Sequence, residues 1–311
     1  MVAQARYTVE HLQPRHLPAL QTLFFRMFGK RHSLAYLQAK YDVGYLGVQH
    51  ASYIAMAGGR AVSFYGMIPM PARRMDSTVL IAQSCDYMTL PEFKSMGLHR
   101  ELAGHAMERA KEEGASFAFA LMSDNSLAVG KKMGWDFNPP MQVTSLPARK
   151  YSVRKAMYRF GLNSLLQDNA EAAFSDLLIE PSRFENSLSG TQFLYIHYSD
   201  DFFRYKKAGG GFHIEVNGVK LWLKGGLQLH IGDLCFEHED QLEPALEEVR
   251  KRAAKAGFSE VIVQCNAQSP LEAYLSSRYA LRPSFDVACS DIDGKSEMRF
   301  LRTNYGDFDT F

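Results

Sequence analysis

Residues 84–99 read SCDYMTLPEFKSMGLH, and this stretch decides how the first half of the chain folds. Its first residues end a predicted strand, Pro91 stops that strand, and a predicted helix begins near Gly97. At such a turn several backbone N–H groups lack helical partners, and the helix dipole adds about half a positive charge. A pyrophosphate can bind there, and Gly97 lets a phosphate approach closely because glycine has no Cβ.

The residues around this stretch predict a mixed α/β fold, because apolar positions switch between helical and alternating spacing. The predicted elements of the first half are, in order, helices over 17–28 and 33–41, strands over 52–57, 61–67 and 78–88, a helix over 97–114, a strand over 117–122 and a helix over 126–133. Two helices therefore precede an antiparallel meander, and a helix and a buried strand follow it.

The second half repeats this order of elements. A meander over 212–236, a helix over 240–257, a strand over 261–263 and a helix over 270–277 are predicted. Gly114 and Gly257 end the corresponding helices of the two halves, and Asn125 and Asn266 lie in the loops that follow the next strand. The two pairs have nearly the same separation in the sequence, which indicates an internal duplication. The alternative is two unrelated domains that share a common order of elements.

Composition and charge narrow the function classes. The formal net charge is +1, without a long run of Lys and Arg, so nucleic acid and membrane surfaces are not expected partners. The four cysteines form no Cys-x-x-Cys pair, and the histidines show no metal-ligand spacing. We therefore expect reduced thiols, no metal, and a cytoplasmic protein that is a monomer or a homodimer.

The turn near Gly97 resembles the cofactor motif of the GNAT acyltransferase superfamily, which has Arg or Gln, two residues, Gly, one residue, then Gly or Ala. Lys94, Gly97 and His99 hold these places. Downstream, the stretches SDNS at 123–126 and KMGW at 132–135 are similar to the family's Asn-containing loop and closing Gly-aromatic step.

This resemblance implies an α/β (α+β) fold class with two GNAT-like domains in tandem, each a mixed, mostly antiparallel twisted sheet flanked by helices. The implied domains are an acyl-CoA-binding domain over 1–148 and a GNAT-like domain over 191–311, joined by a partly helical connector over 149–190. In the second half, the acidic stretch 236–240 stands where the phosphate loop should be, and its carboxylates would repel a pyrophosphate. We expect that half to shape the acceptor pocket or to be structural.

The resemblance also implies a cofactor, acetyl-CoA or another acyl-CoA, and the residues that bind it. The expected cofactor-binding residues are Met88, Thr89, Leu90, Lys94, Ser95, Met96, Gly97, Leu98, His99 and Asn125. Met88 and Leu90 would pair with the pantetheine arm through their backbones. Asp86 is the candidate proton acceptor or ammonium-binding group, and an alternative is a carboxylate that only bonds nearby amides. In many members of the superfamily, a tyrosine on the helix after the Asn-containing loop donates the proton to the CoA thiolate. No tyrosine occurs on that helix here, so the nearby Tyr87 is the candidate proton donor.

The expected function is transfer of an acyl group, most simply acetyl, to a primary amine of a small molecule such as an amino sugar. The amine would attack the thioester directly. Two alternatives stay open: a catalytically inactive acyl-CoA-binding or scaffolding protein, and a tRNA-dependent aminoacyl transferase. The phosphate-binding turn argues against the last of these.

Overall fold

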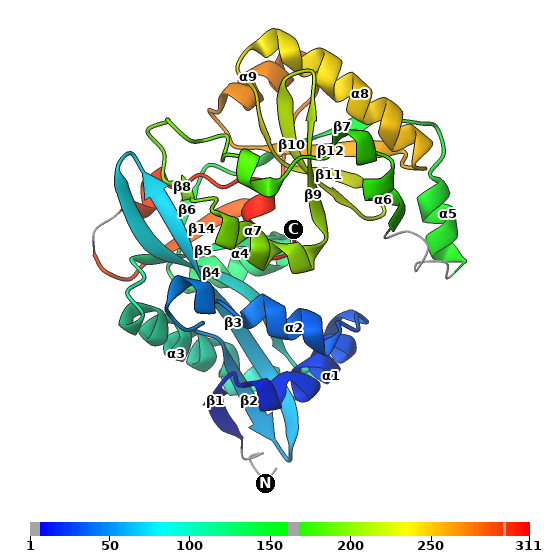
Figure 1. Ribbon diagram of the computed structural model, residues 1–311. Coiled ribbons are helices and arrows are strands. Elements are labelled where there is room, and N and C mark those ends of the chain that lie inside the picture. Colours follow the sequence, from blue (N-terminus) through cyan, green and yellow to red (C-terminus); the bar gives the residue numbers. More distant parts are fainter. Residues whose placement is uncertain (1–6, 161–167, 295–296) are drawn as a thin grey trace. The chain divides into compact units, whose positions relative to one another are not determined.

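The computed structural model describes residues 7–160, 168–294 and 297–311, and the chain divides into two compact units (Figure 1). The first unit comprises Met1–Leu121, Val129–Asp136 and Ala288–Arg299, and the second comprises Met122–Ala128, Phe137–Val287 and Phe300–Phe311. Each unit is built around its own sheet.

The sheet of the first unit has the strand order β1-β2-β3-β4-β5-β14-β6. Its strands are β1 Thr8–His11, β2 Tyr53–Ala57, β3 Arg60–Arg74, β4 Ser77–Thr89, β5 Phe117–Met122, β6 Asp136–Asn138 and β14 Asp286–Asp291. The helices of this part of the chain are α1 Leu17–Phe28, α2 Leu34–Tyr41, α3 Leu98–Glu112 and α4 Asp124–Lys132. The predicted meander is confirmed, since β2, β3 and β4 pair antiparallel in sequence order.

Helices α2 and α3 cover opposite faces of this sheet. Successive residues of a strand point to opposite faces, and Phe64 and Tyr65 are neighbours on β3. Tyr41 of α2 packs on Phe64 with ring centroids 5.5 Å apart, whereas His99 of α3 packs on Tyr65 at 5.4 Å. Both faces of the sheet are therefore covered by a helix. Side chains of β4 that point to one face meet α2, and those that point to the other face meet α3.

The sheet of the second unit has the strand order β13-β7-β12-β11-β10-β9. The strands of this part of the chain are β7 Gln142–Pro147, β8 Tyr195–Ile196, β9 Gly211–Val216, β10 Val219–Gly225, β11 Leu229–Cys235, β12 Glu260–Cys265 and β13 Arg282–Pro283, and of these β8 is not a strand of this sheet. Its helices are α5 Val153–Arg159, α6 Asp168–Ala172, α7 Asp200–Lys206, α8 Leu242–Lys255 and α9 Pro270–Ser276. Leu242, Ala245, Leu246, Val249 and Ala253 of α8 belong to its core, as their helical spacing predicts.

The two sheets exchange strands that are distant in the sequence. β7 follows the first unit's elements along the chain, yet it pairs antiparallel with β12 in the second sheet. β14 comes from the second half, yet it lies beside β5 in the first sheet. The expected division at residue 148 therefore differs from the units of the structure. Sequence periodicity assigns a strand its faces but not its partner, because pairing between distant segments leaves no local pattern.

The expected fold class is confirmed, with two mixed and mostly antiparallel sheets flanked by helices. β3 extends past the expected end at Met67, through Pro69 and Pro71. Its pairing with β2 ends at Tyr65, so these prolines occupy a stretch where β2 needs no donor from β3.

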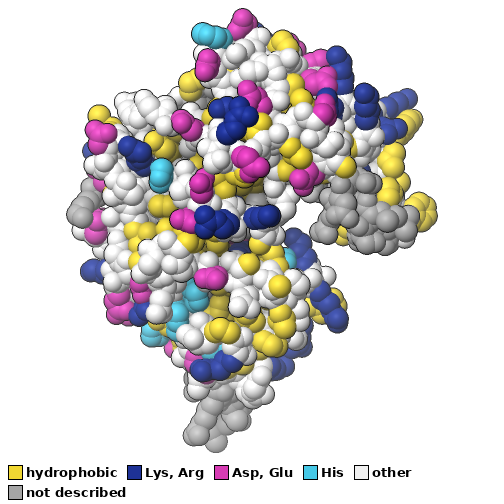
Figure 2. All heavy atoms as spheres, viewed as in Figure 1, with side chains coloured by type: hydrophobic (Ala, Val, Ile, Leu, Met, Phe, Trp, Pro, Cys, Tyr) yellow, Lys and Arg dark blue, Asp and Glu magenta, His cyan; other side chains and the backbone are white. Residues whose placement is uncertain are grey.

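The surface carries charges of both signs (Figure 2), and the cysteines lie apart from one another in the sequence. On the face in Figure 2, basic and acidic side chains are interspersed. Cys85, Cys265 and Cys289 are buried, Cys235 is half-buried, and none of the four takes part in a disulfide. Within residues 7–160, 168–294 and 297–311, no helix combines the length and apolar character that a membrane span needs.

Candidate active site

Strands β4 and β5 separate before either of them ends. Their parallel pairing covers Ala82 with Ala118 and Gln83 with Phe119. β4 continues to Thr89 and β5 to Met122, and no further β4–β5 pair occurs among the described residues. The last residues of β4 therefore carry main-chain groups that β5 does not use.

The alternation of hydrogen bonds along β4 identifies these main-chain groups. The Leu90 amide donates to the Val62 carbonyl over 2.9 Å, and the Met88 carbonyl accepts the Ser63 hydroxyl over 3.1 Å. Both residues thus direct main-chain groups toward β3. Because alternate residues of an antiparallel strand direct their N–H and C=O groups to opposite sides, Thr89 faces the open edge. Of the three strand residues expected to bind cofactor, Thr89 directs its main-chain groups toward this edge, whereas Met88 and Leu90 direct theirs toward β3.

The turn after β4 leads into the start of a helix beside open space. It forms a short 3-10 helix over Pro91–Met96, in which Phe93 is buried while Lys94 and Ser95 are exposed. Gly97 follows with φ 76°, and α3 begins at Leu98. The Gly97 carbonyl accepts the Glu101 amide over 3.1 Å, so the first amides of α3 precede the first helical bond. A Cβ built on Gly97 would have no atom within 4 Å.

A β-bulge lies between the pairing and this turn. Asp86 and Tyr87 of β4 together oppose Tyr65 of β3, and Asp86 has φ 47°, in the left-handed region. Gly66 makes room for the bulge, since a Cβ there would lie 2.9 Å from the Cys85 carbonyl oxygen. Bulges and non-glycine residues in this region concentrate at functional sites, because the surrounding structure must hold them.

A strand splay, a bulge and a helix start thus lie in one segment. Residues 8–137 match the family model of the acetyltransferase (GNAT) domain. We call residues 8–137 the GNAT domain after this match. No curated protein gives a significant sequence match.

Solved structures share the fold across most of the chain. A GCN5-related N-acetyltransferase from Kribbella flavida is 12% identical, with a TM-score of 0.60, and the match covers 93% of this chain and 72% of that one. A GCN5-related N-acetyltransferase from Anabaena variabilis is 9% identical, with a TM-score of 0.59 and coverage of 92% and 73%. A conserved protein of unknown function from Enterococcus faecalis V583 is 9% identical, with a TM-score of 0.61 and coverage of 93% and 73%. The GNAT likeness in fold therefore extends beyond residue 137.

In the GNAT domain, Asp86 is the acceptor of two side-chain hydrogen bonds from α2. The Lys40 ammonium donates to Asp86 Oδ2, and the Tyr41 hydroxyl donates to the same oxygen over 2.9 Å. The side chains of Lys40 and Asp86 are only 7% and 14% exposed. A buried carboxylate needs such partners, because desolvation of an unpaired charge is costly. Asp86 thus lies on the α2 face of the sheet as half of an ion pair.

Tyr87 lies on the opposite face, against α3. Its ring is 4.9 Å from that of His99 and 6.5 Å from that of Tyr65. Burial lowers the pKa of His99 and raises the pKa of Tyr65, whose hydroxyl accepts a hydrogen bond from Ser84. His99 therefore packs as a neutral ring beneath the turn at Gly97, and the neighbouring Leu98 is buried. The structure does not bring Tyr87 and Asp86 together.

Asn125 lies in the first turn of α4, but its side chain is outside the described residues. The sequence of α4 is DNSLAVGKK and contains no tyrosine. Sequence reasoning missed Lys40 and Tyr41, the partners of Asp86. Both end a predicted helix 45 residues or more before Asp86, and no local pattern marks them as its partners.

Proposed function

We propose that the chain is an acyl-CoA-dependent N-acyltransferase, with acetyl-CoA as the simplest donor. The observation that carries the proposal is the open edge of β4, which leads to the start of α3 at Gly97 in a segment that matches the GNAT domain. A pantetheine arm would pair with Thr89, and its diphosphate would meet the N–H groups of Leu98, His99 and Arg100. The positive end of the α3 dipole favours an anion there.

The proposed reaction is direct attack of a primary amine on the thioester carbonyl. A C–N bond forms, the C–S bond breaks, and the amine gives up a proton while the CoA thiolate gains one. Asp86 is the proposed group that binds the acceptor's ammonium and takes its proton, since it lies at the bulge beside the open edge. The acceptor's ammonium would compete with Lys40 for the carboxylate. Tyr87, packed against His99, is assigned no step.

The proposed acceptor is a small molecule with a primary amine, such as an amino sugar. An anionic oxygen at Asp86 suits a cationic acceptor, and Lys40 already shows an ammonium bound to it. The proposal assigns a proton acceptor but no side chain as donor to the thiolate, because α4 has no tyrosine.

The test is a thiol-release assay with acetyl-CoA and a panel of amines, together with calorimetric titration of acetyl-CoA. Saturable binding with amine-dependent thiol release is expected. Binding without release on any amine would favour an inactive acyl-CoA-binding protein, which the ion-paired Asp86 and the missing tyrosine also suit. No binding of any acyl-CoA would contradict both functions.

A further inference from the structure

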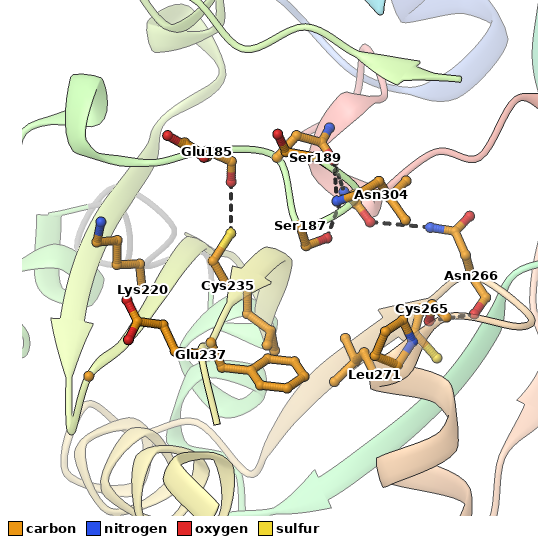
Figure 3. A pocket seen from close by; sticks show the side chains of 17 residues that line it. Glu185, Ser187, Ser189, Lys220, Cys235, Glu237, Cys265, Asn266, Leu271 and Asn304 are labelled. Carbon is orange, nitrogen blue, oxygen red and sulfur yellow. Dashed lines mark hydrogen bonds between the residues drawn. The ribbon is translucent and has the colours of Figure 1, made fainter. Parts of the chain in front are cut away.

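The second unit contains a cavity of about 630 Å³ where β11 and β12 separate (Figure 3). Their parallel pairing ends at Ile231 with Val263, whereas the strands run on to Cys235 and Cys265. Both of these cysteines line the cavity. The cavity lies where two parallel strands diverge, as the opening between β4 and β5 does in the GNAT domain.

Three asparagines form a fixed polar wall of this cavity. Asn304 Nδ2 donates to Asn186 Oδ1 over 3.0 Å and to the Ser187 hydroxyl over 3.2 Å, and Asn266 Nδ2 donates to Asn304 Oδ1 over 3.2 Å. The Thr303 amide orients Asn266 by donating to its Oδ1 over 3.1 Å. Each asparagine is at most 5% exposed. Asn186 Oδ1 also accepts the Leu188 amide over 2.9 Å, so its two lone pairs are used within the protein. The network holds Asn266, Asn304 and the Ser187 hydroxyl in fixed positions, and these are the groups it can offer to a ligand.

The rest of the lining is apolar or weakly polar. Leu234, Phe236, Pro270 and Leu271 contribute carbon surface, and burial raises the pKa of Cys235 and of Cys265, so both thiols are neutral. The charged lining side chains are Glu185, Lys220 and Glu237, of which both glutamates are exposed. In Figure 3, Lys220 and Glu237 lie across the cavity from Asn266 and Asn304. An uncharged ligand with several hydrogen-bonding groups fits this interior.

A phosphate does not fit the turn that follows β11. Gln241 Oε1 accepts the amides of Glu237 and His238 over 3.1 and 3.0 Å, so the side chain already occupies the groups that would bind an anion. A Cβ on Gly218 would lie 2.6 Å from Gln241 Nε2, so this glycine leaves room for the glutamine. Glu237, Glu239 and Asp240 add negative charge at the same place.

We propose that this cavity binds an uncharged, chain-like small molecule that carries amide and hydroxyl groups and no phosphate, with the chemistry of pantetheine. The open strand ends supply main-chain partners for its amides, the asparagine wall supplies side-chain partners, and Gln241 excludes a diphosphate. This binding does not depend on whether the GNAT domain catalyses acyl transfer.

The experiment is saturation-transfer NMR of the full chain with pantetheine, in the absence and presence of excess CoA. Saturable binding that CoA does not displace is expected. Leu271→Trp places an indole in the cavity and should abolish this binding, whereas Leu227→Trp, at an exposed position of the same unit outside the lining, should leave it unchanged.

Circular dichroism checks that each variant folds. Should Leu271→Trp fail to fold, Ser187→Ala removes one hydrogen-bonding group from the wall and should weaken pantetheine binding. Displacement by CoA would move the pantetheine to the GNAT domain and overturn the inference. Absence of saturable binding, or equal loss in the two tryptophan variants, would overturn it as well. Acyl transfer is not measured, so failure here is distinct from failure of the proposed enzyme function.

Discussion

Lys40, at the end of α2, donates a hydrogen bond to Asp86, the left-handed residue of the β4 bulge. The pair joins the helix layer to the strained point of the strand from which the proposed cofactor cleft opens. Its energetics and its chemistry can be tested separately.

Asp86→Asn should lower kcat/KM for the amine by about 10²- to 10⁴-fold, because it removes the proposed proton acceptor. Affinity for acetyl-CoA should not change, since Asp86 precedes Thr89 and the Gly97 turn. Steady-state kinetics and calorimetry measure the two effects. Asp76→Asn, at an exposed turn, is the matched control. Unchanged kcat/KM in Asp86→Asn would remove Asp86 from the mechanism.

Lys40→Met should lower the free energy of unfolding by on the order of 3 kcal/mol, because Asp86 then keeps a buried charge without its cation. The double variant Lys40→Met with Asp86→Asn should recover most of this loss. Chemical denaturation of the four proteins gives the coupling energy. Additive effects would show that the pair contributes no interaction of its own.

Gly97→Glu should abolish acetyl-CoA binding, since it directs an anion at the amides of α3. The substitution also strains a backbone at φ 76°, which costs about 1 kcal/mol. Gly114→Glu is the matched control, because Gly114 has φ 89°, no atom within 4 Å of an added Cβ, and a place at the other end of α3. Calorimetry should find binding lost only in Gly97→Glu. Equal affinities in the two variants would place the diphosphate elsewhere.

Acid should reduce the contribution of His213 to the stability of the second unit, whereas the buried Asp233 and Asp307, whose pKa values burial raises to about 7 and about 8, act in the opposite direction. Burial lowers the pKa of His213 to about 4, whereas an unfolded histidine has a pKa of about 6.5. The unfolded chain therefore binds the extra proton, so the contribution of His213 to stability is complete above pH 6.5 and is lost as the pH falls toward 4.

His213 stacks on Trp222 with centroids 5.3 Å apart, so His213→Phe should keep the packing and remove the loss of stability that protonation of His213 causes in acid. Denaturation followed by tryptophan fluorescence at pH 7.5 and 4.5 measures this change. An equal loss of stability in the variant and the parent protein would assign the acid sensitivity to other groups.

Phe311→Ala should destabilise the second unit by about 3–5 kcal/mol, the cost of emptying a buried aromatic site. The Phe311 ring contacts those of Trp222 and Tyr305 at 5.0 and 5.5 Å, and it is 2% exposed. Phe160→Ala is the control, because Phe160 is 80% exposed and should cost little. Thermal unfolding compares them, and equal midpoints would contradict the packing of Phe311.

The sequence predicted most helices, strands and turns, because each of them depends on residues within its own segment. The apolar spacing of α8 and the Asn217-Gly218 turn, with φ 51° and 78°, belong to their own segments. The face of the sheet to which Tyr87 points could not be predicted from the sequence. The bulge at Asp86 inserts one residue into β4, so the alternation of side chains between the two faces shifts by one residue. The pairing of Lys40 with Asp86 and the exchange of β7 and β14 depend on tertiary contacts between distant segments.

In the proposed function, the amides at the start of α3 bind the diphosphate of an acyl-CoA. A crystal structure of the chain soaked with acetyl-CoA tests it most directly. Diphosphate density is expected against the N–H groups of residues 98–100, with the pantetheine arm along Thr89. Cofactor density in the β11–β12 cavity, or an α3 start with no ligand beside it while cofactor is bound elsewhere, would contradict it.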